Sequence, residues 1–216
     1  GIAGGGKGAV VPGFRGSTFS IQQPLKADAD GRYTKASFLT AGGVLNPPSP
    51  GSYFTTSDSL LTTVDTAGGR ERMSTKATGD LSRPRWYPSG VLLPTGETIA
   101  FSGADRDEVA LPGFEFPVKQ AELFDPKSET WRPLAEGHRP RTYHNTAALL
   151  PDGRVLIGGH APITTAYLRH ITIPGGLTAP NEGRDPSFEI YKPPYMFRGA
   201  RPKIESAGPV GYGRET

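Results

Sequence analysis

The chain has 216 residues, and 24 basic against 21 acidic residues give it a formal net charge of +3. The basic residues are scattered singly, which argues against nucleic-acid binding. No apolar run approaches the roughly 18 residues of a membrane-spanning helix, and the absence of cysteine excludes disulfides and thiolate metal sites from this stretch. The abundant Gly (29) and Pro (22) favour many short strands joined by turns.

The first predicted strands lie upstream of a pair of glycines. Residues 19–21 are β-compatible, residues 26–32 are polar enough for a turn, and residues 36–41 return toward Gly42 and Gly43. Residues 59–65 predict a further strand. This region therefore resembles a weak copy of a unit that recurs more clearly downstream.

A motif occurs twice in the middle of the chain. Residues 84–96 read PRWYPSGVLLPTG and lead to Gly103, whereas residues 140–153 read PRTYHNTAALLPDG and lead to Gly159. The Tyr of the second copy follows the Tyr of the first by 56 residues. A period of this size indicates a repeat architecture.

Each copy predicts two antiparallel strands with a turn between them. In the second copy the strands cover residues 146–150 and 154–157, and Pro-Asp-Gly makes the turn. A second strand pair is predicted from residue 120 to residue 131, and residues 187–191 are its equivalent in the following unit. Four strands in 50–60 residues with paired glycines are typical of a kelch-type β-propeller blade.

The predicted fold is all-β, with about three blades of a kelch-type propeller over residues 1–200. A propeller closes with roughly 4–8 blades, so we expect the chain to be a segment of a longer protein. Its first residues, which lack an initiator Met and an apolar leader, agree with that expectation. The proline-rich end differs from the repeat, and residues 201–216 predict the start of an immunoglobulin-like β-sandwich.

Three stretches carry a resemblance to a known family. Residues 141–145, residues 149–159 and residues 188–204 resemble the galactose oxidase and glyoxal oxidase group of copper radical oxidases. In that group the same order marks the last part of a seven-bladed propeller and the entry into a C-terminal sandwich. The match is strong over residues 120–216, fair over 80–119 and weak before that.

The resemblance implies a copper site of which this chain supplies a part. Members of the group hold one copper with two Tyr and two His, and one of the Tyr is bonded to a Cys and carries a radical. Tyr143 and His144 correspond to the adjacent Tyr-His pair, with Tyr143 as the catalytic base and His144 as a metal ligand. The Tyr-Cys radical cofactor and the second His are not encoded here, so the chain alone is expected to be inactive.

The resemblance also implies the setting in which the parent protein works. It would be a secreted, extracellular and monomeric oxidase. Its substrates would be primary alcohols, aldehydes or sugars, oxidised with O2 to give H2O2. The alternative is a non-catalytic kelch propeller that binds glycan or protein.

Packing offers a simpler interpretation of the same residues. Tyr143 could be an interblade aromatic beside a solvated His144, and Trp86 and Tyr87 are predicted to pack between blades rather than to carry a radical. Because neighbouring side chains of a strand point to opposite faces, Tyr143 and His144 can share a metal only if the chain bends there. The remaining histidines are expected in loops: His138, His160 and His170.

Overall fold

The computed structural model describes residues 17–44, 55–106, 116–161 and 184–200, and single residues 203, 205, 206 and 208. This part of the chain consists of strands in three antiparallel sheets and two short 3-10 helices, η1 (Ala67–Gly69) and η2 (Pro194–Phe197). The predicted all-β class is confirmed. None of the helices in the described ranges is long and apolar enough to cross a membrane.

The first blade is a four-stranded sheet whose strands follow one another in chain order. Its strands are β1 (Phe19–Gln22), β2 (Lys35–Ala41), β3 (Ser59–Asp65) and β4 (Arg72–Ala77). The predictions for β1, β2 and β3 are confirmed, but β4 was not predicted. Every residue of β4 is exposed, so this edge strand has no apolar alternation for sequence analysis to detect.

The second and third blades repeat the same order of strands. The second contains β5 (Ser89–Leu92), β6 (Thr98–Phe101), β7 (Gln120–Asp125) and β8 (Thr130–Glu136). The third contains β9 (Thr146–Leu149), β10 (Val155–Gly158) and β11 (Phe188–Tyr191), with β10 in the middle. Each of these seven strands either lies within a residue or two of its predicted position or is a member of a strand pair that the sequence predicts.

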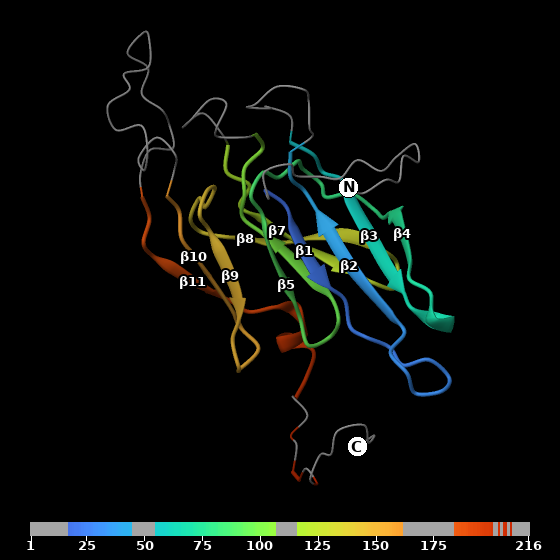
Figure 1. Ribbon diagram of the computed structural model, residues 1–216. Coiled ribbons are helices and arrows are strands. Elements are labelled where there is room, and N and C mark those ends of the chain that lie inside the picture. The colour runs from blue at the N-terminus through green and yellow to red at the C-terminus, as the bar shows by residue number, and fades with distance from the viewer. Residues whose placement is uncertain are drawn as a thin grey trace.

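The first strand of each blade lies beside the first strand of the next. β5 packs between β1 and β9, and Figure 1 shows the three sheets arranged side by side around this row of first strands. The arrangement is propeller-like, as the repeat predicts. The predicted sandwich at residues 201–216 lies almost wholly outside the described residues and stays a prediction.

Apolar side chains between the blades form the core. A cluster that includes Val91, Ile99, Leu123 and Val155 fills the space between the second and third blades. Between the first and second blades, Phe19 reaches so close to β5 that a Cβ on Gly90 would lie 2.5 Å from its ring. A glycine is therefore required at position 90 for the two blades to meet.

A glycine that follows the second strand of a blade binds the next blade in both cases. Gly43 has a φ of 105° and donates its N–H to the carbonyl oxygen of Arg85 at 2.7 Å. Gly103 has a φ of 92° and donates in the same way to Arg141 at 2.9 Å. Both residues have a positive φ, a backbone conformation that favours glycine, so the turn at these positions explains why glycine stands there.

Candidate functional site

Tyr143 and His144 lie at a sharp bend just before β9. His144 has a φ of 51°, a left-handed conformation that non-glycine residues rarely adopt. The two rings stack with centroids 3.8 Å apart and planes 30° from parallel. The bend that two neighbouring residues need in order to share a metal is thus present, and the two side chains lie together.

The second blade supplies an aromatic support for this pair. Trp86 is 1% exposed and stacks on the ring of Tyr143, with centroids 5.1 Å apart and an interplanar angle of 12°. Tyr87 meets Tyr143 edge to face at 4.8 Å and His144 at 6.3 Å. The predicted interblade packing of Trp86 and Tyr87 is confirmed, and one of its partners is the candidate ligand itself.

Asn145 fastens the end of the bend to the second blade. Its Nδ2 donates to the carbonyl oxygens of Tyr87 at 2.8 Å and Thr142 at 2.9 Å, and its Oδ1 accepts from the hydroxyl of Ser89 at 2.7 Å. All the polar atoms of this side chain are used in holding the bend. A side-chain amide whose donors and acceptor are all bonded in this way restricts a loop to one conformation.

The two copies of the motif differ by one residue where the chain bends. Counting from the hairpin turns, Leu92 pairs with Thr98 and Leu149 pairs with Val155, so equivalent residues are 57 apart. The left-handed residues Tyr87 and His144 are also 57 apart. The structural equivalent of His144 is therefore Tyr87, not the Pro88 that alignment of the two tyrosines implies.

The same count makes Trp86 the equivalent of Tyr143. Trp86 exchanges backbone hydrogen bonds with Ala104, and the carbonyl oxygen of Tyr143 accepts the N–H of Ala161. Both members of the second contact lie 57 residues after their counterparts in the first. Arg85 and Arg141, by contrast, are 56 apart and accept the same interblade hydrogen bond. The third blade consequently has one extra residue between its Arg and its bend.

A buried histidine accepts the backbone N–H of Thr142. Thr142 is fully buried, and its N–H lies 3.1 Å from Nδ1 of His160, which is 4% exposed. His160 does lie in a loop, as predicted, but it is a buried hydrogen-bond acceptor rather than an ordinary loop residue. His170 lies outside the described residues.

Each of these two blades also contains an Arg-Glu pair with a buried Arg, which sequence analysis missed. Arg85 binds Glu122 of β7 at 2.6 Å, and both side chains are at most 1% exposed. Arg141 binds Glu189 of β11 at 3.3 Å. Burial lowers the pKa of the Arg85 guanidinium, while the hydrogen bond and charge of Glu122 oppose that shift. The sequence feature that could have revealed these pairs is the single Glu inside the otherwise apolar third strand of each blade.

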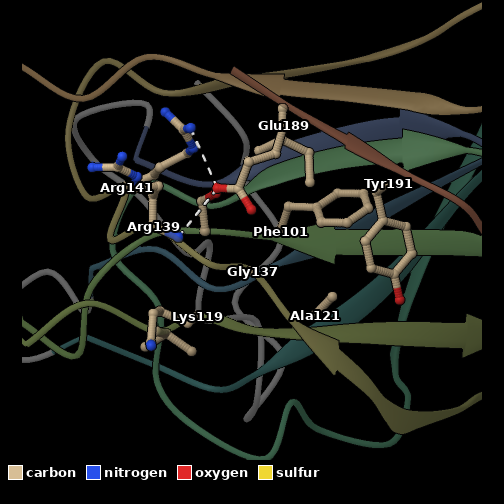
Figure 2. Close-up of a pocket in the computed structure, with 11 residues that line it drawn as sticks. Phe101, Lys119, Ala121, Gly137, Arg139, Arg141, Glu189 and Tyr191 are labelled. Atoms are coloured by element: carbon tan, nitrogen blue, oxygen red, sulfur yellow. Dashed lines mark hydrogen bonds and ion pairs between the residues drawn. The ribbon is translucent and has the colours of Figure 1, made fainter. Parts of the chain in front are cut away.

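These pairs hold the connections between blades. Glu122 accepts the N–H of Ser82, and Glu189 accepts the N–H groups of His138 and Arg139. Figure 2 shows the contact of Arg141 with Glu189 beside a small cavity between the second and third blades. The cavity has a volume of about 10 Å³, room for one water molecule rather than a substrate.

The donor atoms at the bend suit copper but make only part of a site. A phenol oxygen from Tyr143 and an imidazole nitrogen from His144 belong to the N,O set that Cu(II) prefers. Tyr143 is half-buried and His144 is exposed, so both are accessible. Within the described ranges, no group of three or more His, Cys, Asp or Glu could hold a metal ion. Further ligands would have to come from elsewhere.

Comparison with known proteins identifies the family. The family described as Glyoxal oxidase N-terminus matches residues 13–193. The chain belongs to this family. The resemblance to the galactose oxidase and glyoxal oxidase group, drawn from three short stretches, is confirmed over most of the chain.

Two relatives and one solved structure illustrate the similarity. The chain is 34% identical over 139 residues to "Aldehyde oxidase GLOX" of Vitis pseudoreticulata, which covers 58% of this chain. It is 28% identical over 179 residues to "Galactose oxidase" of Gibberella zeae, which covers 79% of it. A solved fungal alcohol oxidase of the AA5 family, in complex with copper, has a TM-score of 0.48 and 20% identity, covering 66% of this chain and 31% of that one.

The matched regions are a minor part of these relatives. The chain spans 23% of the length of the Vitis aldehyde oxidase and 23% of the length of the Gibberella galactose oxidase.

Proposed function

We propose that this chain is a segment of a secreted copper radical oxidase in which Tyr143 and His144 are two of the copper ligands. The parent oxidises primary alcohols, aldehydes or sugars with O2 and releases H2O2. The observation that carries the proposal is the left-handed bend at His144, which brings the two rings to 3.8 Å. Membership of the glyoxal oxidase N-terminal family supports it.

The residues of this chain would have distinct roles in the reaction. The bound copper and a Tyr-Cys radical encoded outside these residues supply the two one-electron acceptors. His144 holds the metal through its imidazole. The Oη atom of Tyr143 receives the proton that leaves the substrate hydroxyl. Trp86 covers one face of Tyr143 and limits the access of water to that ring.

The same proposal covers the wider organisation. The three blades belong to a kelch-type propeller over residues 1–200, and residues 201–216 begin an immunoglobulin-like sandwich. Such a propeller would present the bend at one end of its central axis, where the first strands β5 and β9 lie together. Domains beyond these residues would provide the remaining ligands.

The test is peroxide formation by the longer protein that contains this chain. We expect copper-dependent H2O2 release with at least one class among primary alcohols, aldehydes and sugars. Tyr143→Phe removes the proton acceptor and should lower the rate by about 100-fold or more. Tyr87→Phe, the matched control in the second blade, should retain most of the rate.

The contradicting outcome would favour the binding alternative. If the parent sequence lacks a Cys and a partner Tyr upstream and a His downstream, the radical chemistry has no cofactor. Absence of peroxide from the copper-loaded parent would then leave Tyr143 and His144 as packing residues of a glycan- or protein-binding propeller.

A further inference from the structure

The extra residue of the third blade creates a specific need for a hydrogen-bond acceptor. In the second blade the backbone alone is sufficient, because Arg85 donates its N–H to Thr56 and Trp86 donates to Ala104. In the third blade Thr142 stands between the Arg and the residue equivalent to Trp86. Its N–H is buried, and leaving such a group unpaired costs about 1–3 kcal/mol.

His160 meets that need with a fixed imidazole. A backbone N–H can only donate, so Nδ1 of His160 is the acceptor at 3.1 Å and the ring proton is on Nε2. The Thr142 hydroxyl lies 3.3 Å from the same nitrogen. The backbone of His160 is held in turn, since its carbonyl oxygen accepts the N–H of Asp185 at 3.0 Å.

The consequence of this contact lies one and two residues further along. With Thr142 accommodated, Tyr143 takes the place that Trp86 has in the second blade, and His144 takes the left-handed place of Tyr87. Without the extra residue the Tyr would occupy the bend and the His would enter the strand. Neighbouring side chains of a strand point to opposite faces, so the two rings could not then lie together.

We propose that His160 is a positioning residue for Tyr143 and His144. It accepts the N–H of the extra residue Thr142 and so maintains the one-residue offset that puts the Tyr on Trp86 and the His in the bend. His160 does not touch a reacting group in this account. The copper readout below rests on the proposed function, whereas the positioning role stands on the backbone geometry.

Three variants of the copper-free and copper-loaded parent protein test this role. His160→Asn keeps an acceptor, since Oδ1 of Asn, like Nδ1 of His, is two bonds beyond Cβ. His160→Leu keeps the bulk and removes the acceptor. Gln23→Ala is the control, because it deletes another buried side-chain contact, from Gln23 to Thr98 at 3.3 Å, far from the bend in the sequence.

The first measurement is amide hydrogen exchange of residues 140–146 without copper. We expect at least tenfold faster exchange in His160→Leu, near wild-type exchange in His160→Asn and no change at these residues in Gln23→Ala. Equal protection in the Leu variant and the wild type would overturn the proposal. If the Leu variant does not fold, loss of protection in His160→Asn overturns it and retained protection supports it.

The second measurement is the Kd for Cu(II). Partners that orient metal ligands typically change metal affinity by about 10- to 100-fold, so His160→Leu should weaken binding by about tenfold or more and His160→Asn by less than threefold. A Leu variant that loses stability but binds copper as tightly as the wild type would contradict the role. If the wild type binds no copper, the proposed function fails and the exchange measurement still decides the role of His160.

Discussion

The second and third blades share one scaffold and differ in what they expose at its end. Both contain an Arg-Glu pair with a buried Arg, a Leu-Leu-Pro-x-Gly hairpin and an interblade hydrogen bond to the Arg carbonyl. At equivalent positions, however, the second blade has Trp86, which is 1% exposed, and the third has the half-buried Tyr143. The repeat therefore builds the frame, and a one-residue departure from the repeat presents the candidate ligands.

The two Arg-Glu pairs also differ in their degree of burial. In the second blade both partners are at most 1% exposed, whereas Glu189 in the third blade keeps 17% of its side-chain surface exposed. Water near Glu189 can solvate a charge that has lost its partner. The same contact should thus be worth more to stability in the second blade.

The largest predicted effect is on stability when the arginines are replaced. Arg85→Met leaves Glu122 charged and buried and should lower the free energy of unfolding by about 3–5 kcal/mol. Arg141→Met should cost about 1–3 kcal/mol, because Glu189 remains partly solvated. Urea unfolding of the parent protein measures both.

A second variant separates the charge from the packing. Arg85→Met combined with Glu122→Leu should recover most of the lost stability, since neither charge remains buried. Equal losses for Arg85→Met and Arg141→Met would show that the difference in burial between the blades has no energetic consequence.

The next effect concerns the glycine that faces the bend. A Cβ at Gly159 would lie 2.4 Å from the carbonyl oxygen of His144, and both atoms belong to backbone-fixed positions. Gly159→Ala should cost about 1–3 kcal/mol of stability and should also displace His144. Gly68 is the matched control, because it has a φ of 70° but no atom within 4 Å of its ideal Cβ.

Thermal unfolding and Cu(II) affinity are the two readouts for these glycines. Gly68→Ala should show only the strain of a left-handed alanine, about 1–2 kcal/mol, with unchanged copper affinity. A Gly159→Ala variant that also keeps its copper affinity would mean that the position of His144 does not depend on this contact.

The smallest effect belongs to an exposed contact between the first two blades. Lys76 and Glu129 form an ion pair at 2.6 Å with exposed side-chain fractions of 58% and 33%. Lys76→Met should change the free energy of unfolding by about 0.2–1 kcal/mol, and the difference should vanish at about 1 M salt. A loss as large as that of Arg85→Met would contradict the dependence on burial.

Sequence periodicity was sufficient for the frame. Apolar strands, Pro-x-Gly turns and closing glycines predicted nearly every strand of the second and third blades, because burial on one face and turn chemistry are local properties. The fully exposed β4 of the first blade carries neither signal. Its position is known only from the structure, in which it pairs with β3.

The site was predicted in part for the same reason. The Tyr143-His144 pair and the need for a bend follow from side-chain alternation in strands. The offset of 57 residues, the acceptor at His160 and the Arg-Glu pairs depend on contacts between residues 18 to 48 positions apart. Identical spacing of the two tyrosines from their closing glycines hid the extra residue. The third blade has one residue more between its Tyr and its hairpin, and one residue fewer between its hairpin and its closing glycine.

Copper binding by the parent protein tests the central claim most directly. A titration of the wild type with Cu(II) should give one bound ion per chain, and His144→Ala should weaken binding by about 100-fold or more. His138→Ala, which removes an exposed imidazole from the connection between blades, should leave the Kd unchanged. Failure of the wild type to bind copper, or equal affinities for the wild type and His144→Ala, would contradict the assignment of this bend as a copper site.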